Sequence, residues 1–370
     1  MPCPYRELIL TNKPKAVRLA KDNLGRKQMT TELCQKVQGS LVGTAIGDAV
    51  GMPVETLSQD KIREETGGRG VTGFSKPTQT NIPDTANMKV GDTTDDTQLT
   101  LVVAKSLICS GGWDRKDCVE EHIREYEQKM FGWGGTTADA IKEIMEGKRS
   151  ISDQWRAECA PNTGCGNGVI MKVAPLALFE AVRQKQPSTI RLAELCMDLG
   201  SITHPDPRAS FAAYAVALMT GIVMHHPITL PEQGLALLQR TVAAVIMLEQ
   251  KYAGFRPNPD KVSDRLLRIP FVLDDPKAVR QELGCSFRAL DTVAFTLATF
   301  IRHPTDFRFS VLEAVNAGGD TDTNASIVGA MVGANVGLKN IPEQWFNFRK
   351  EYREIADIGE QLYDVACHAK

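Results

Sequence analysis

The sequence predicts an all-α fold, and three observations support this prediction. Apolar residues recur at helical spacing from about residue 32 onward, beginning with Val37, Leu41, Val42, Ala45 and Ile46. No segment of convincing length alternates polar and apolar residues; the segment 71–74 resembles a short strand but lies within a Gly-rich loop. Low-complexity tracts and regular internal repeats are absent, so we expect one globular body of packed helices.

Helices are expected in order at 98–108, 115–130, 137–145, 209–224, 231–250, 278–283, 287–301, 309–317, 322–337 and 342–367. The segment 209–224 is apolar nearly all round, which indicates a buried central helix. Gly329, Gly333 and Gly337 follow one another at intervals of four, which favours close approach of a neighbouring helix over a membrane dimer. The long loop 60–88 is rich in Gly, Pro, Thr and Asn, and loops of this length are often functional.

Composition excludes several classes of protein. Of the 370 residues, 42 % are hydrophobic and 24 % charged, and the net charge is −2, so nothing points to nucleic acid or membrane as a partner. The nine cysteines are odd in number and form no C-x-x-C pair, which disfavours a zinc cluster or a disulfide framework. We see no signal peptide and no uninterrupted apolar run of about 20 residues. These features together predict a cytoplasmic location.

Residues 1–29 differ in character from the rest of the chain. They contain seven Lys or Arg and only two acids, with three prolines and little apolar periodicity. They are interpreted as a basic N-terminal arm preceding a single domain at 30–370. A loosely ordered terminus is the commoner fate of such a segment, and a partner-binding arm is the alternative.

Two short segments concentrate carboxylates and hydroxyls where a helix is expected to begin. The first is GDTTDDT at 91–97, and the second is GGDTDT at 318–323. Such side chains are favoured as N-caps, but one cap needs only one oxygen side chain. Crowded carboxylates are costly unless a positive charge neutralises them, and oxygen ligands without His or Cys favour Mg²⁺, Mn²⁺ or Ca²⁺. If the segments converge, they could hold two metals; if they do not, they are caps.

Three further segments offer candidate site residues with ordinary alternative readings. Glu55 follows the helix-breaking Pro53 in a Gly-rich stretch, where it is either a ligand-facing carboxylate or a solvated surface acid. The loop 162–168 opens a helix and is either a phosphate cradle or a plain turn. His204 lies between Thr203 and Pro205 and is either a ligand or general acid–base group, or a hydrogen-bonded loop histidine.

These five segments together resemble the ADP-ribosylglycohydrolase (DraG-like) family. The matching motifs are, in order, GxxxGDAxGxPxE at 43–55, TDDT at 94–97, GxGNGxxMKxxPL at 164–176, THxDP at 203–207 and GGDTDTxA at 318–325. Each is moderately specific alone, and five in register are highly specific. The resemblance implies a compact orthogonal multi-helix bundle with a central binuclear metal site. One departure is Lys172, where the family usually has Arg, which keeps the charge but loses the planar fork.

The resemblance also implies an activity and roles for named residues. The reaction would be hydrolysis of the bond between ADP-ribose and a modified protein side chain, most often arginine, with two divalent metals, Mg²⁺ or Mn²⁺. The metals would grip the ribose hydroxyls, and an activated water would attack the anomeric carbon while a carboxylate moves the proton. The implied metal ligands are Thr94, Asp95, Asp96, Asp320, Asp322 and Thr323; the implied catalytic residues are Glu55, Asp95 and Asp322; the implied substrate-binding residues are Gly164, Gly166, Asn167, Gly168 and His204.

Within the family, immunity proteins that neutralise ADP-ribosyltransferase toxins look like this domain with an N-terminal extension. The resemblance therefore suggests that residues 1–29 bind such a toxin, making the chain an antitoxin as well as a hydrolase. Alternatives are a binding or inhibitor protein with little turnover, a crystallin-like structural protein, which the intact aspartates disfavour, and a metal-dependent phosphohydrolase.

Overall fold

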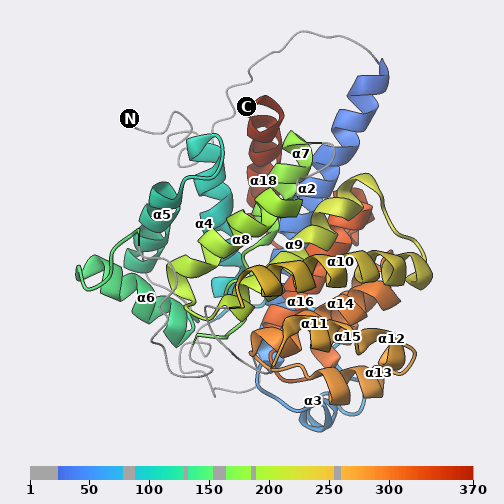
Figure 1. Cartoon of the computed structure of the whole chain (residues 1–370). Coiled ribbons are helices and arrows are strands. Elements are labelled where there is room, and N and C mark those ends of the chain that lie inside the picture. Colours follow the sequence, from blue (N-terminus) through green and yellow to red (C-terminus); the bar gives the residue numbers. More distant parts are fainter. Residues whose placement is uncertain are drawn as a thin grey trace.

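The computed structural model describes residues 24–77, 88–128, 132–152, 164–184, 189–253 and 260–369, and these residues form a helical bundle (Figure 1). The elements are α2 (Leu24–Gly51), η1 (Met52–Val54), α3 (Gln59–Glu65), α4 (Asp95–Ser110), α5 (Arg115–Glu127), α6 (Gly135–Met145), α7 (Ala174–Arg183), α8 (Thr189–Thr203), α9 (Pro207–His225), α10 (Pro231–Lys251), α11 (Val262–Leu266), α12 (Ile269–Val272), α13 (Pro276–Ala278), η3 (Val279–Leu283), α14 (Ala289–Arg302), α15 (Phe307–Asn316), α16 (Thr321–Val336), η4 (Leu338–Asn340), α17 (Glu343–Phe346) and α18 (Glu351–His368).

The predicted all-α class is confirmed. Within the ranges described, no residue lies in a β-strand, and the two isolated bridges join Ser58 to Gly318 and Gly166 to Arg288. The segment 71–74 is therefore not a strand. Most expected helices are present within a few residues of their predicted ends, and α3 and α8 were not expected. Seven cysteines fall in the described part of the chain, and none of these seven is in a disulfide.

The expected helix at 342–367 is broken into α17 and α18. The break coincides with tertiary contacts of two of the four residues that separate α17 from α18. The ring of Phe348 stacks on that of Phe74 with 4.3 Å between centroids. Arg349 donates to the carbonyl oxygen of Val90 and pairs with Asp92 at 2.8 Å. These contacts anchor the loop that leads into α4, and they override the local helical pattern.

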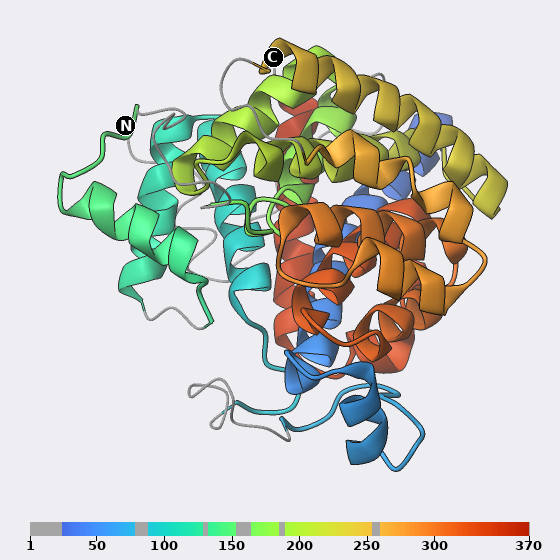
Figure 2. The same cartoon turned by 60° about the horizontal axis from the view of Figure 1, so that its bottom comes forward.

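Helix α9 is the buried central helix that the sequence predicts. By length and composition it is the one helix of the described residues that passes as a membrane span, but 94 % of its apolar window is buried inside the protein. It is surrounded by α7, α8, α10, α14 and α16. Helices α5 and α6 lie on one side of the molecule and α10 to α15 on the other, with α2 and α16 between them (Figures 1 and 2).

Helices α2 and α16 pack antiparallel along a glycine seam, defined here as Gly39, Gly43, Gly47 and Gly51 of α2 against Gly333, Gly329, Ala325 and Thr321 of α16. A β-carbon added at Gly39 would lie 2.7 Å from the carbonyl oxygen of Gly333, so the two backbones touch. The predicted close approach at Gly329 and Gly333 is confirmed. Gly337 also meets α2, since a β-carbon added at Gly39 would lie 2.8 Å from its carbonyl carbon, but it follows the end of α16 with φ +82°, a conformation that favours glycine.

The N-terminal boundary falls within α2, which begins at Leu24. Of the predicted basic arm, residues 1–23 lie outside the described residues, and 24–29 form the first turns of this helix. The arm's proposed partner binding therefore stays a prediction.

Candidate active site and metal centre

The two acidic-hydroxyl segments converge at one cavity. Helices α4 and α16 begin beside each other, and the Thr323 hydroxyl donates to Asp96 Oδ2 at 3.2 Å. A cavity of about 400 Å³ opens over this junction. Its wall includes Glu55, Thr94, Asp95, Asp96, Gly166, Asn167, Gly168, His204, Asp320, Asp322 and Thr323. Eleven of the twelve residues that the sequence analysis selected therefore surround a single space.

These side chains do not act as N-caps of their own helices. Neither Thr94 at the start of α4 nor Asp320 at the start of α16 makes a side-chain capping hydrogen bond. The start of α4 is capped instead from α2, because Asp48 accepts hydrogen bonds from the backbone N–H groups of Thr94 and Thr97 at 2.9 and 3.1 Å. The hydroxyls of both threonines also donate to Asp48. The N-cap residues of the two segments therefore do not cap their own helices, although Asp322 Oδ1 accepts from the backbone N–H of Thr323 at 2.9 Å.

Three carboxylates form the centre of the cluster. Glu55, Asp320 and Asp322 each offer an oxygen, and the three oxygens all lie within 4.8 Å of one another. Nearby, Oδ1 of Asp96 is buried and has no hydrogen-bond partner. A buried carboxylate oxygen without a donor is costly, and a cation would remove that cost. The donor set consists of carboxylate and hydroxyl oxygens, so it fits a hard divalent cation.

The electrostatics of the cluster agree with this reading. Burial raises the pKa of Asp96 and of Asp322 well above the usual value, and neighbouring carboxylates raise both further. Burial, with Asp320 and Asp48 nearby, raises the pKa of Glu55 to about 7. Burial also raises the pKa of Asp95 well above its usual value. The charged neighbours with the largest effects on the pKa values of these carboxylates are thus negative.

The Gly-rich loop contributes a second wall of the cavity. Asn167 donates from Nδ2 to Asp320 Oδ2 at 2.6 Å and to Thr292 Oγ1 at 3.0 Å. Its backbone N–H donates to the carbonyl oxygen of Phe287 at 3.0 Å, which ties the loop to the start of α14. Asn167 therefore orients one of the central carboxylates. Gly164, in contrast, does not line the cavity; it has φ +75° and packs against the ring of Pro205.

His204 lines the same cavity as the carboxylates, and Gly168 makes room for it. A β-carbon at Gly168 would lie 2.7 Å from Cε1 of His204 and 3.2 Å from Oγ1 of Thr137. The position requires glycine for space, since any side chain would push the imidazole out of place.

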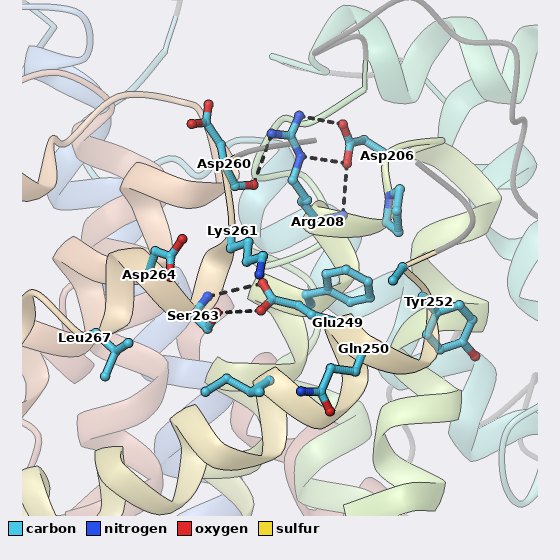
Figure 3. Close-up of a pocket in the computed structure, with 14 residues that line it drawn as sticks. Asp206, Arg208, Glu249, Gln250, Tyr252, Asp260, Lys261, Ser263, Asp264 and Leu267 are labelled. Carbon is cyan, nitrogen blue, oxygen red and sulfur yellow. Dashed lines mark hydrogen bonds and ion pairs between the residues drawn. The ribbon is translucent and has the colours of Figure 1, made fainter. Parts of the chain in front are cut away.

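A second cavity of about 400 Å³ lies behind the turn that follows His204 (Figure 3). Figure 3 shows Arg208 between Asp206 and the main chain of Asp260. Asp206 accepts from Nη2 of Arg208 at 2.8 Å and from the backbone N–H of Arg208 at 3.0 Å, so it caps α9. This buried ion pair braces the 204–208 turn and thereby the position of His204.

Comparison with known proteins decides the family. The family model described as ADP-ribosylglycohydrolase matches residues 29–370. The chain belongs to the ADP-ribosylglycohydrolase family. The predicted resemblance is confirmed over nearly the whole chain, and membership assigns the protein to hydrolases of ADP-ribosyl linkages.

Curated relatives of this ADP-ribosylglycohydrolase chain cover most of its length. The "ADP-ribosylarginine hydrolase Tri1" of Serratia proteamaculans is 25 % identical over 91 % of this chain and 81 % of its own. The "ADP-ribosylhydrolase ARH3" of Mus musculus is 25 % identical over 89 % of this chain and 91 % of its own. The "ADP-ribosyl-[dinitrogen reductase] glycohydrolase" of Rhodospirillum rubrum is 24 % identical over 89 % and 95 %.

A solved structure titled "ADP-ribosylglycohydrolase-related protein complex" has the same fold. It superposes with a TM-score of 0.63 at 24 % identity, and the match covers 91 % of this chain and 99 % of that one. The predicted bundle of the ADP-ribosylglycohydrolase type is therefore confirmed.

Sequence reasoning missed Asp48, although it lies within a quoted motif. Asp48 is fully buried in α2, and burial raises its pKa to about 6 even though it accepts four hydrogen bonds. The available signal was an aspartate inside an apolar helical run, because such a residue must find a partner outside its own helix. Phe287 and the strip at 134–137 also line the cavity and gave no signal.

Proposed function

We propose that this chain hydrolyses the N-glycosidic bond between ADP-ribose and an arginine side chain of a modified protein, using two divalent cations, Mg²⁺ or Mn²⁺. One observation carries the proposal: the carboxylate oxygens of Glu55, Asp320 and Asp322 lie within 4.8 Å of one another, facing a cavity. The name of the Serratia relative, an ADP-ribosylarginine hydrolase, supports arginine as the acceptor.

The residues that would hold the cations are Thr94, Asp95, Asp96, Asp320, Asp322 and Thr323. When bound, two divalent cations supply Lewis acidity that lowers the pKa of water and neutralises the clustered carboxylates. The protein holds this ligand set in place from its surroundings. Asp48 fixes the start of α4, and Asn167 fixes Asp320. Preorganised ligands of this kind avoid the cost of reordering during the reaction.

Glu55 is suited to moving the proton. It lies at the end of η1 rather than at a helix start, it is half-buried, and it lines the cavity beside Asp322. In the reaction, a water oxygen bonds to the anomeric carbon as the bond from that carbon to the guanidine nitrogen breaks. One water proton goes to the Glu55 carboxylate, which passes it on to the leaving guanidine nitrogen. The products are ADP-ribose and unmodified arginine.

The test is product release from a defined substrate. An arginine-ADP-ribosylated protein is incubated with Mg²⁺ or Mn²⁺ and either the wild-type chain, Asp322→Asn, or the exposed control Asp274→Asn. We expect release of ADP-ribose by wild type and control, and none by Asp322→Asn. Release of AMP or inorganic phosphate would replace the proposal with a phosphohydrolase. Cleavage of a serine-linked ADP-ribosyl substrate but not the arginine-linked one would show that arginine is not the acceptor side chain.

The role of residues 1–29 in binding an ADP-ribosyltransferase toxin stays a prediction, as does the cytoplasmic location. Deleting 1–23, which leaves α2 intact, separates the two roles. Turnover should survive the deletion, and toxin affinity should be lost if the arm binds it.

A further inference from the structure

A chain of three buried side chains runs from the interior to the active-site cavity. Nζ of Lys172 donates to Oγ1 of Thr203 at 3.1 Å, and the same Oγ1 lies 2.9 Å from Nδ1 of His204. All three residues are at most 2 % exposed. We infer that Lys172 and Thr203 are positioning residues that hold His204 as the tautomer with its proton on Nε2, aimed at an acceptor oxygen of the ADP-ribosyl group. This inference rests on the proposed function for the identity of the ligand.

Counting donors fixes the direction of the chain. An ammonium group has three donors and no acceptor, so Thr203 Oγ1 must accept from Lys172. The threonine oxygen has a second lone pair, so it could also accept from an Nδ1–H group, but its own buried proton would then have no acceptor. Donation from the hydroxyl to Nδ1 leaves neither group unpaired, so we assign Nδ1 as the acceptor of that bond. In a neutral imidazole the remaining nitrogen carries the proton, which leaves Nε2 as a donor.

The Nε2 atom is on the cavity side. His204 lines the cavity, and an added β-carbon at Gly166 would lie 3.5 Å from its Nε2 atom, and one at Gly168 3.1 Å from it. Within the described part of the chain, Nε2 has no hydrogen-bond partner. The N–H group is thus presented between two glycines of the Gly-rich loop, where a ligand in the cavity can accept from it. Diphosphate and hydroxyl oxygens of ADP-ribose are acceptors of this type.

The surroundings keep the imidazole neutral. Burial, together with the positive charges of Lys172 and Arg149, lowers the pKa of His204 to about 3. A neutral imidazole can either donate or accept at Nε2, so its tautomer decides whether it can bind an oxygen acceptor. The hydrogen bonds from Lys172 to Thr203 and from Thr203 to His204 select the tautomer with its proton on Nε2.

Lys172 is not placed as one half of an ordinary ion pair. Its ammonium forms no ion pair within the described ranges, and its one hydrogen bond there goes to Thr203. The groups facing it from α5 are Cys118 and His122, and the acid that acts on it is Asp95 at a distance. A fully buried ammonium with one bond is costly, so its retention needs a use beyond filling space.

The first test reads the tautomer directly, without any ligand. In the ¹⁵N spectrum of the full chain with its histidines labelled, His204 should show a protonated Nε2 and an unprotonated Nδ1. Thr203→Val removes the hydroxyl at constant shape and should abolish this preference, whereas Thr203→Ser should keep it. An Nδ1–H tautomer in the wild type would overturn the inference.

The second test measures ADP-ribose affinity by calorimetry in the presence of Mn²⁺. Loss of one donor to a charged oxygen should weaken binding by about tenfold to a hundredfold in Thr203→Val. Thr203→Ser should bind like wild type. Thr220→Val serves as the matched control, because Thr220 is equally buried but its hydroxyl bonds only to its own helix at Val216.

Mn²⁺ affinity should be the same in all these variants, which separates a misplaced donor from a damaged metal site. Equal ADP-ribose affinity in Thr203→Val and wild type would refute the role of the chain of bonds. A wild type that has the inferred tautomer but binds no ADP-ribose would instead count against the proposed function.

Discussion

Replacing Lys172 with methionine should stabilise the fold while weakening ADP-ribose binding. Burial lowers the pKa of Lys172 from 10.5 to about 8, so the folded state binds the proton of this lysine more weakly than the unfolded state does. At pH 7 this difference amounts to about 3 kcal/mol against folding, at roughly 1.4 kcal/mol per pKa unit. Methionine also forfeits the bond to Thr203, which is worth about 1 kcal/mol. The expected net gain in the free energy of unfolding is about 2 kcal/mol.

The sign of the pH dependence gives a sharper test. Between pH 8 and 10.5 the unfolded lysine binds a proton that the folded one has released, so the wild type gains stability as pH rises through this window. Lys172→Met lacks this gain. Urea unfolding at constant metal concentration, from pH 7 to 10, should therefore show the gap between variant and wild type narrowing above pH 8.

The exposed Lys277→Met is the control and should track the wild type at every pH. A Lys172→Met protein that is less stable than wild type at pH 7, or a gap that stays constant up to pH 10, would refute the reasoning. Reduced ADP-ribose affinity in a more stable protein would show that the buried charge is retained for function.

Three further predictions follow from the carboxylate cluster and the Gly-rich loop. Asp96→Asn should abolish metal-dependent turnover. It should also raise the melting temperature of the metal-free protein, because it removes one of the mutually repelling carboxylates. A lower melting temperature would contradict this prediction. Because burial raises the pKa of Glu55 to about 7, metal-free stability should fall as pH rises from about 4.5 to 7. Mn²⁺ binding at pH 7 should then release protons, seen as a calorimetric heat that varies with buffer ionisation enthalpy; a buffer-independent heat would argue against it. Gly168→Ala should displace His204 and lower ADP-ribose affinity at least tenfold. Gly135→Ala should not lower it, because Gly135 lines the same cavity with open space around it. Equal losses of affinity in the two variants would rule out the steric explanation.

The sequence predicts the carboxylate cluster better than it predicts the residues that hold this cluster and His204 in place. The segments at 94–97 and 318–323 stand out because each has more oxygen side chains than one cap needs, and the structure brings them together. Asp48 escapes notice because its partners, Thr94 and Thr97, are more than 40 residues away in the chain. The same reason hides the bond from Lys172 to Thr203, since spacing within one helix carries no information about which helices meet.

Local pattern also fails where tertiary contacts compete with it. The apolar periodicity of 342–367 predicts one helix, yet Phe348 and Arg349 lie between two helices. Phe348 stacks on Phe74, and Arg349 donates to the carbonyl oxygen of Val90. Conversely, α3 forms inside a segment whose composition indicates a loop, with Ser58 capping its start. Helix boundaries of this kind depend on neighbours that only the folded chain reveals.

The glycine seam has a consequence for how the protein reaches its active form. Its contacts repeat every four residues, so α2 and α16 could also dock one step out of register, displaced by about 6 Å along their axes. Such a slip would carry the start of α4, which Asp48 of α2 holds, away from Asp322 of α16 by more than a single cation can bridge, given ligand distances of about 2–2.6 Å. A bound divalent cation would therefore stabilise only the correctly docked arrangement of α2 and α16. The cations would then favour correct assembly of the fold as well as take part in the reaction.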